Sequence, residues 1–92
     1  MSMRQYFSYN AAIGLASVVN ARVTPVGINT IRLATTADCY VVIGTTPTAT
    51  VAAGMLIKAS TGGENFGIAA GEQVAVISGT AGGTLNITEM TQ

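Results

Sequence analysis

Cys39 is the only cysteine of the 92-residue chain, and the chain has no histidine. A nucleophilic cysteine needs a base, together with an electropositive and partly exposed setting that stabilises the thiolate. Cys39 instead lies between Asp38 and the apolar residues 40–42. A single cysteine also rules out a disulfide within the chain. The sequence therefore predicts that Cys39 is a small buried hydrophobe.

The acidic residues are the other groups able to do chemistry, and they are far apart in the sequence. A glycosidase needs two carboxylates held across a sugar, and a calcium site needs several oxygen ligands at close spacing. Neither pattern occurs, and the chain has too few ligands for structural zinc. We expect each acid to be a solvated charge at a strand end or in a turn: Asp38, Glu64, Glu72 and Glu89.

Two glycine-rich stretches, "STGGENFG" (60–67) and "SGTAGGT" (78–84), resemble phosphate-binding loops. Both lack the Lys-Ser/Thr pair that follows such a loop, so we interpret them as hairpin turns. The sequence thus predicts a protein that is not an enzyme. We expect it to have no catalytic residues, cofactor, metal or small-molecule substrate.

The composition is typical of an all-β protein. Hydrophobic residues make up 49% of the chain but aromatic residues only 5%, so Ala, Val, Ile and Leu dominate. β-branched residues fit a pleated strand surface, and the many glycines fit turns. Ninety-two residues form one domain with a thin core.

Charge is scarce: charged residues make up 9% of the chain and the net charge is zero, whereas a typical soluble domain has about 25% charged residues. Near-zero net charge promotes association, so we expect a homo-oligomer or an assembly component. Arg4, Arg22 and Arg32 precede every acid, which fits either an acidic partner or chance. Nucleic-acid binding is disfavoured because no basic patch can form. No apolar run is long enough to span a membrane; the longest, residues 11–19, only weakly resembles a secretory signal.

Strand patterns recur from residue 28 onward, separated by turns. The continuous apolar run 39–44 predicts a central strand covered on both sides, and Leu85 and Ile87 alternate with polar residues in the last strand. Short strands at this spacing favour a small antiparallel sandwich or barrel. Whether residues 11–26 form one strand or two is left open. The expected strands are 28–35, 39–44, 54–60, 64–69, 74–78 and 84–90.

Three of the five aromatic residues lie in the first ten positions. One interpretation is an ordinary edge strand packed on its own core. The other is an N-terminal arm of residues 1–10 that docks on a neighbour, followed by a β-sandwich domain of residues 11–92. The candidate interface residues of that arm are Arg4, Tyr6, Phe7 and Tyr9.

Three stretches resemble small structural proteins of tailed-phage virions: "TIRLATTADCYVVIGTTPTATVAAGMLI" (30–57), "ENFGIAAGEQVAVI" (64–77) and "GTAGGTLNITEM" (79–90). The resemblance covers about two-thirds of the chain, and the N-terminal third is not part of it. It implies a jelly-roll-like β-sandwich that acts as a capsid decoration, or cement, protein. Such proteins form homo-oligomers on the outer capsid surface of the virion and bridge subunits of the major capsid protein.

We accordingly expect a homo-oligomer (dimer or trimer) whose partner is the major capsid protein. Two alternatives remain. One is a tail or head-fibre component of a virion. The other is a β-sandwich module that binds a glycan or a receptor.

Overall fold

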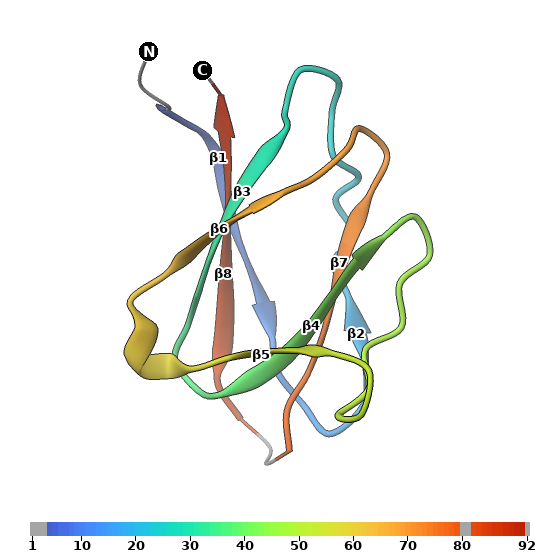
Figure 1. Ribbon diagram of the computed structural model, residues 1–92, viewed down its shortest axis with the longest axis vertical. Coiled ribbons are helices and arrows are strands. Elements are labelled where there is room, and N and C mark those ends of the chain that lie inside the picture. The colour runs from blue at the N-terminus through green and yellow to red at the C-terminus, as the bar shows by residue number, and fades with distance from the viewer. Residues whose placement is uncertain (1–3, 80–81, 92) are drawn as a thin grey trace.

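The computed structural model describes residues 4–79 and 82–91, which form two antiparallel sheets packed face to face (Figure 1). Residues 1–3 of the expected arm and residues 80–81 of the last glycine turn lie outside the described residues. A short 3-10 helix, η1 (Ala59–Thr61), precedes β6. The strands are β1 (Arg4–Ala12), β2 (Val18–Val19), β3 (Thr30–Thr35), β4 (Cys39–Gly44), β5 (Met55–Ile57), β6 (Glu64–Gly67), β7 (Gln73–Ile77) and β8 (Thr84–Thr91).

The strand order is that of a jelly roll. Sheet I has the order β1-β8-β3-β6, and sheet II has the order β2-β7-β4-β5. The first four strands pair with the last four in reverse, β1 with β8, β2 with β7, β3 with β6 and β4 with β5. The chain is therefore one long hairpin rolled into two layers, which the β3–β8 and β4–β7 pairs complete. This confirms the expected jelly-roll-like antiparallel β-sandwich.

The core lies between the two sheets and consists of aliphatic side chains at alternate strand positions. This alternation, predicted for β3 and β8, follows from the two-residue period of a strand. Sheet I contributes Ile31, Leu33, Leu85 and Ile87, and sheet II contributes Val41, Ile57, Val74 and Val76.

Cys39 belongs to this core, as predicted. Its side chain is fully buried and its thiol is free. Burial raises the pKa of the Cys39 thiol above its usual value, so the unreactive protonated form is favoured. The Sγ atom lies 3.8 Å from Oγ1 of Thr35, a weak polar contact.

The prediction that residues 39–44 are covered on both sides is wrong. β4 is central in sheet II, between β7 and β5, and Val41 is buried against sheet I. Tyr40 and Val42 point to the other face and are only partly buried. The reason is that a two-layer sandwich covers only the inner face of each sheet.

The N-terminal region forms two strands. β1 ends at Ala12, β2 contains only Val18 and Val19, and the chain then runs without strand structure to β3. Residues 4–10 belong to β1, which pairs with β8 from Arg4 opposite Thr91 onward. The described part of the expected arm is thus an edge strand of sheet I, the first of the two interpretations above. Docking of this strand on a neighbour stays a prediction.

The outer face of sheet I is polar. Nδ2 of Asn86 donates a hydrogen bond to Oδ1 of Asn10 across 2.7 Å, and the hydroxyls of Ser8 and Thr88 lie 3.2 Å apart. Because side chains alternate along a strand, Phe7 and Tyr9 of β1 point to the opposite, inner face. These two rings begin the site described next.

Candidate functional site

The chemistry-bearing groups considered in the sequence do not gather in the structure. Within residues 4–79 and 82–91, no group of three His, Cys, Asp or Glu side chains is placed to hold a metal ion. The same residues contain no helix long and apolar enough to cross a membrane. The notable polar cluster lies instead beside β1.

Glu89 is the centre of this cluster, and the prediction that it is a solvated charge is wrong. Its side chain is 0% exposed, because residue 89 continues the inward series of Leu85 and Ile87 along β8. Of the other three predicted acids, Asp38 and Glu64 are exposed, and Glu72 is partly buried and accepts a hydrogen bond from the Ala69 amide through Oε1 at 2.7 Å. A buried carboxylate needs a compensating partner. Glu89 has one in Arg22.

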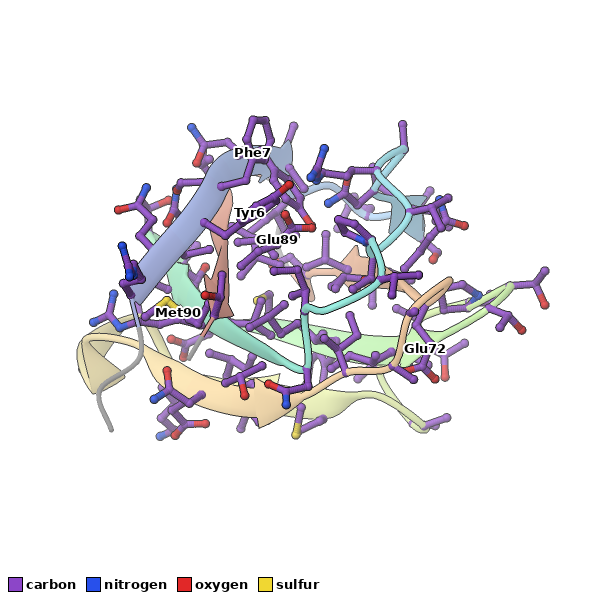
Figure 2. The ribbon with its side chains drawn as sticks, turned by 90° about the horizontal axis from the view of Figure 1, so that it is seen from above. Tyr6, Phe7, Glu72, Glu89 and Met90 are labelled. Atoms are coloured by element: carbon purple, nitrogen blue, oxygen red, sulfur yellow. The ribbon has the colours of Figure 1, made fainter. Side chains whose placement is uncertain are left out.

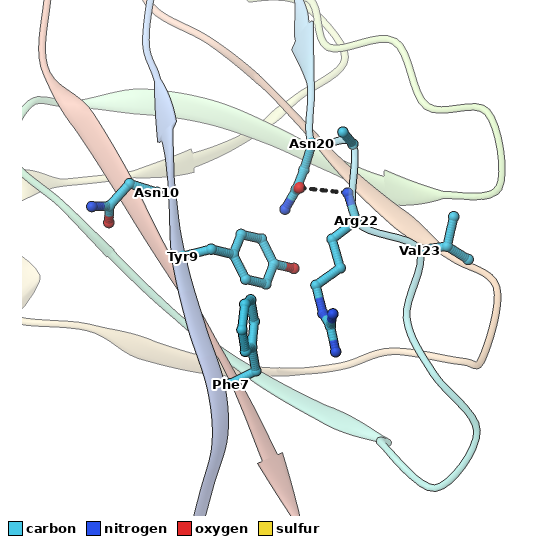
Figure 3. A pocket seen from close by; sticks show the side chains of 7 residues that line it. Phe7, Tyr9, Asn10, Asn20, Arg22 and Val23 are labelled. Atoms are coloured by element: carbon cyan, nitrogen blue, oxygen red, sulfur yellow. Dashed lines mark hydrogen bonds between the residues drawn. The ribbon is translucent and has the colours of Figure 1, made fainter.

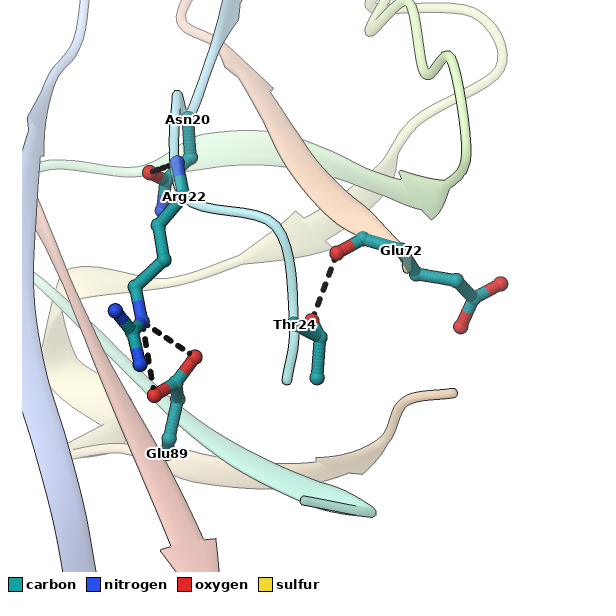
Figure 4. A network of polar contacts seen from close by, with 5 residues as sticks. All are labelled: Asn20, Arg22, Thr24, Glu72 and Glu89. Carbon is teal, nitrogen blue, oxygen red and sulfur yellow. Dashed lines mark hydrogen bonds and ion pairs between the residues drawn. The ribbon is translucent and has the colours of Figure 1, made fainter. Parts of the chain in front are cut away.

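Arg22 reaches Glu89 from the opposite side of the sandwich (Figure 4). Its Nε atom donates to both carboxylate oxygens of Glu89, at 3.0 Å and 2.9 Å. These hydrogen bonds raise the pKa of the Arg22 guanidinium above its usual value. The Arg22 side chain is 32% exposed, so it lies between the buried acid and solvent.

The backbone around Arg22 is fixed although it lies outside any strand. Oδ1 of Asn20 accepts a hydrogen bond from the Arg22 amide at 2.8 Å, and the Asn20 amide donates to the Val74 carbonyl, also at 2.8 Å. Two residues further on, Thr24 is tied to the Glu72 carbonyl through both its amide and its hydroxyl. Segment 20–24 is thereby anchored to β7 and to Glu72, the residue that precedes it, which orients the arginine.

Phe7 and Tyr9 complete the cluster (Figure 3). The guanidinium of Arg22 lies 4.2 Å from the centre of the Phe7 ring, within cation–π distance. The rings of Phe7 and Tyr9 are 5.6 Å apart and tilted by 37°. Burial raises the pKa of Tyr9 above its usual value, and the negative charge of Glu89 adds to the increase, so the phenol stays protonated at neutral pH.

A β-bulge sets the direction of these rings. The pairing of β1 with β8 shifts between Gln5 and Phe7, so Tyr6 is the extra residue. Phe7 is then directly opposite Glu89. Figure 2 shows Tyr6, Phe7 and Glu89 grouped beside β1, with Glu72 set apart from them.

The cluster borders a solvent-open hollow of about 560 Å³, which we call the β1 hollow. β1 forms one wall and the segment after β2 forms the other. Nδ2 of Asn20 is buried there and makes no hydrogen bond with a described residue. The lining residues are Phe7, Tyr9, Asn10, Asn20, Ala21, Arg22 and Val23.

The structure brings together two of the four predicted interface residues. Phe7 and Tyr9 line the hollow, and Tyr6 is 57% exposed at the bulge. Arg4 is exposed at the start of β1 and does not line the hollow.

Sequence reasoning missed Glu89 and Arg22. For Glu89 a signal was available, since Leu85, Ile87 and Glu89 share one strand face. For Arg22 and Asn20 the sequence offers no such period, because they lie outside any strand.

Comparison of the chain with protein-family models, with curated proteins and with solved structures finds no match.

Proposed function

We propose that this chain is a capsid decoration protein of a tailed-phage virion. In this proposal it binds the outer head surface, bridges neighbouring subunits of the major capsid protein and acts as a homo-oligomer, a dimer or trimer. The observation that carries the proposal is the edge strand β1, nine residues long, which exposes Tyr6 and Phe7 and pairs on one side only within the described residues. Long unprotected edges invite pairing with another chain.

A second surface supports a bridging role. The outer face and edges of sheet II expose aliphatic side chains on β2 and β5, Val18, Val19, Met55 and Leu56. With only 9% charged residues, the chain has few groups to keep such surfaces apart. A protein that links two neighbours needs two contact surfaces, and β1 and sheet II lie on different parts of the sandwich.

The test is co-sedimentation of the purified chain with heads of the phage that encodes it, after removal of their own copies. Removing residues 1–10 is a poor probe, because it removes most of β1, one of the two strands that pair with β8, and uncovers the core. Tyr6→Ser changes an exposed side chain and leaves that pairing in place. We expect it to weaken head binding at least tenfold.

Val26→Ser is the matched control, because Val26 is 92% exposed and lies in the loop between β2 and β3. It should bind heads like the unaltered chain. If both variants bind heads with the same affinity, the contact with the head does not involve Tyr6. No binding of the unaltered chain would contradict the proposed function.

The β1 hollow favours one alternative, a module that binds a glycan. Two aromatic rings, an arginine and the Asn20 amide line it, and such groups also recognise sugars. Saturable binding of a neutral oligosaccharide by the isolated chain, lost in Tyr9→Ala, would support this alternative over the capsid role.

A further inference from the structure

We infer that the β1 hollow and the free edge of β1 together bind an extended acidic peptide segment. The segment adds to sheet I as a strand and places one carboxylate on the outer side of the Arg22 guanidinium. This inference rests on the proposed function in taking the β1 edge as a docking surface, and it deepens that function by naming the chemistry of the partner.

Arg22 has unused hydrogen-bonding capacity. Its Nε donates to Glu89, whereas Nη1 and Nη2 make no hydrogen bond with any described residue. The buried carboxylate of Glu89 holds the guanidinium on its inner side, and the ring of Phe7 lies against it. A fork of N–H donors fixed in this way matches a carboxylate, with little ordering cost on binding.

The charge arrangement favours an acidic ligand. Glu89 is fully buried behind Arg22, so a carboxylate that approaches from solvent lies closer to the positive charge than to the negative one. Arg4 is opposite Thr91 and therefore on the same face of sheet I as Phe7, along the path of an added strand. No acidic residue precedes Asp38 in the sequence.

The free edge of β1 favours a peptide over a small acid or a sugar. β1 is an edge strand of sheet I. The edge of β1 that faces away from β8 pairs with no strand among the described residues. An extended peptide can add there through main-chain hydrogen bonds. Every second side chain of the added strand then faces the side of β1 on which Phe7 and Tyr9 line the hollow. Acids at alternate positions of the peptide are thereby directed toward Arg22 and Arg4.

The experiment uses the full chain and a capped octapeptide, Thr-Val-Glu-Val-Glu-Val-Thr-Ser. Affinity is measured by calorimetry, and amide hydrogen exchange is measured by NMR. We expect saturable binding that weakens as salt rises, with slower exchange in β1 but not in β6, the other edge of sheet I. The same peptide with Gln in place of Glu should bind at least tenfold more weakly.

The decisive variant is Arg22→Gln combined with Glu89→Gln. It removes both charges without leaving a buried carboxylate unpaired, and it should weaken binding of the acidic peptide at least tenfold. Arg32→Gln is the matched control, because Arg32 is exposed and bonds to the Gly62 carbonyl beside β6. Should the double variant fail to fold, Arg4→Gln replaces it, and about threefold weaker binding is expected.

Several results would overturn the inference. They are equal binding of the Glu and Gln peptides, unchanged affinity in the charge-free variant, or protection confined to strands other than β1. Binding of glucuronate at Arg22 without peptide binding would identify a small acid as the ligand instead. Self-association that buries β1 would identify a second copy as the occupant.

The inference and the proposed function fail separately. Loss of head binding with intact peptide binding contradicts only the capsid role. Head binding that persists without any peptide binding contradicts only the acidic-peptide inference.

Discussion

Phe7 and Glu89 are direct cross-strand partners in β1 and β8, and Arg22 from the opposite side of the sandwich contacts both. This cluster therefore connects the two sheets at the side of the molecule where β1 and the segment after β2 face each other. Among the residues that the structure describes, no strand pairing joins sheets I and II there. At this side of the core, a polar interaction holds the two sheets together, whereas apolar contacts hold them together elsewhere.

Loss of the Arg22 charge should destabilise the protein more than loss of both charges. Arg22→Leu leaves the carboxylate of Glu89 buried without a partner, which is costly. Arg22→Leu combined with Glu89→Leu removes the uncompensated charge, and it is expected to match or exceed the stability of the unaltered chain. Thermal unfolding followed by circular dichroism measures both. Equal midpoints for the single and double variants would contradict this view of the pair.

Ile87→Ala should cost about 2–5 kcal/mol of unfolding free energy, because it leaves a cavity between the sheets. Ile87 is fully buried, whereas Leu15 is 65% exposed. Leu15→Ala is therefore the control, with an expected change within about 0.5 kcal/mol. Urea unfolding at neutral pH gives both values. A small effect at Ile87 would mean that β8 does not line the core.

Gly54→Ala should destabilise the turn before β5. A Cβ atom at residue 54 would lie 2.6 Å from Cβ of Tyr40 and 2.8 Å from the carbonyl oxygen of Thr50. Overpacking of this kind costs about 1–3 kcal/mol. At Gly14 a Cβ atom meets nothing within 4 Å and φ is not positive, so Gly14→Ala should be neutral or slightly stabilising. Urea unfolding of the two variants side by side tests the difference.

Stability should fall in alkali. Burial raises the pKa of the Cys39 thiol, and burial together with the charge of Glu89 raises the pKa of Tyr9. Both groups hold their protons more tightly in the folded chain than in the unfolded chain. The stabilisation is therefore fully present below the usual values of 9.0 and 10.0, and it is lost as pH rises through the raised ones.

The measurement is the urea midpoint as a function of pH from about 7 upward. Cys39→Ala and Tyr9→Phe remove the titrating groups, so the alkaline slope should be shallower in the double variant. Because Cys39→Ala also changes packing, the slopes are compared and not the absolute stabilities. Parallel profiles would show that other groups control the alkaline transition.

The sequence predicts individual strands better than their arrangement. The alternation in β3 and β8 and the turn glycines before β6 and β8 are local signals, so those elements were expected close to where they lie. Strand pairing is not local: Ser8 pairs with Thr88, which lies near the other end of the sequence. The two-residue period assigns a residue to a face of its strand but does not name the neighbouring strand. For the same reason, the apolar run of β4 did not indicate how many layers cover it.

The candidate site was predicted in part, for a related reason. The aromatic residues Phe7 and Tyr9 stood out by their position, but their partner Arg22 lies outside any strand. Glu89 was assigned to solvent from its charge alone, although its place after Leu85 and Ile87 put it on the inner face of β8. Its charge favours solvent, whereas its position on the strand favours the core. Glu89 is buried because Arg22 compensates its charge.

The rolled hairpin also constrains how the chain folds during synthesis. β1 is made long before its partner β8, and at roughly 5–20 residues per second the interval lasts several seconds. Throughout that time the aromatic strand has neither its ladder partner nor the carboxylate that holds Arg22. Closure of sheet I is thus a late, non-local step, of the kind that makes β-sandwiches fold slowly. Until β8 is made, both edges of β1 are open to pairing with the β1 of another unfinished copy.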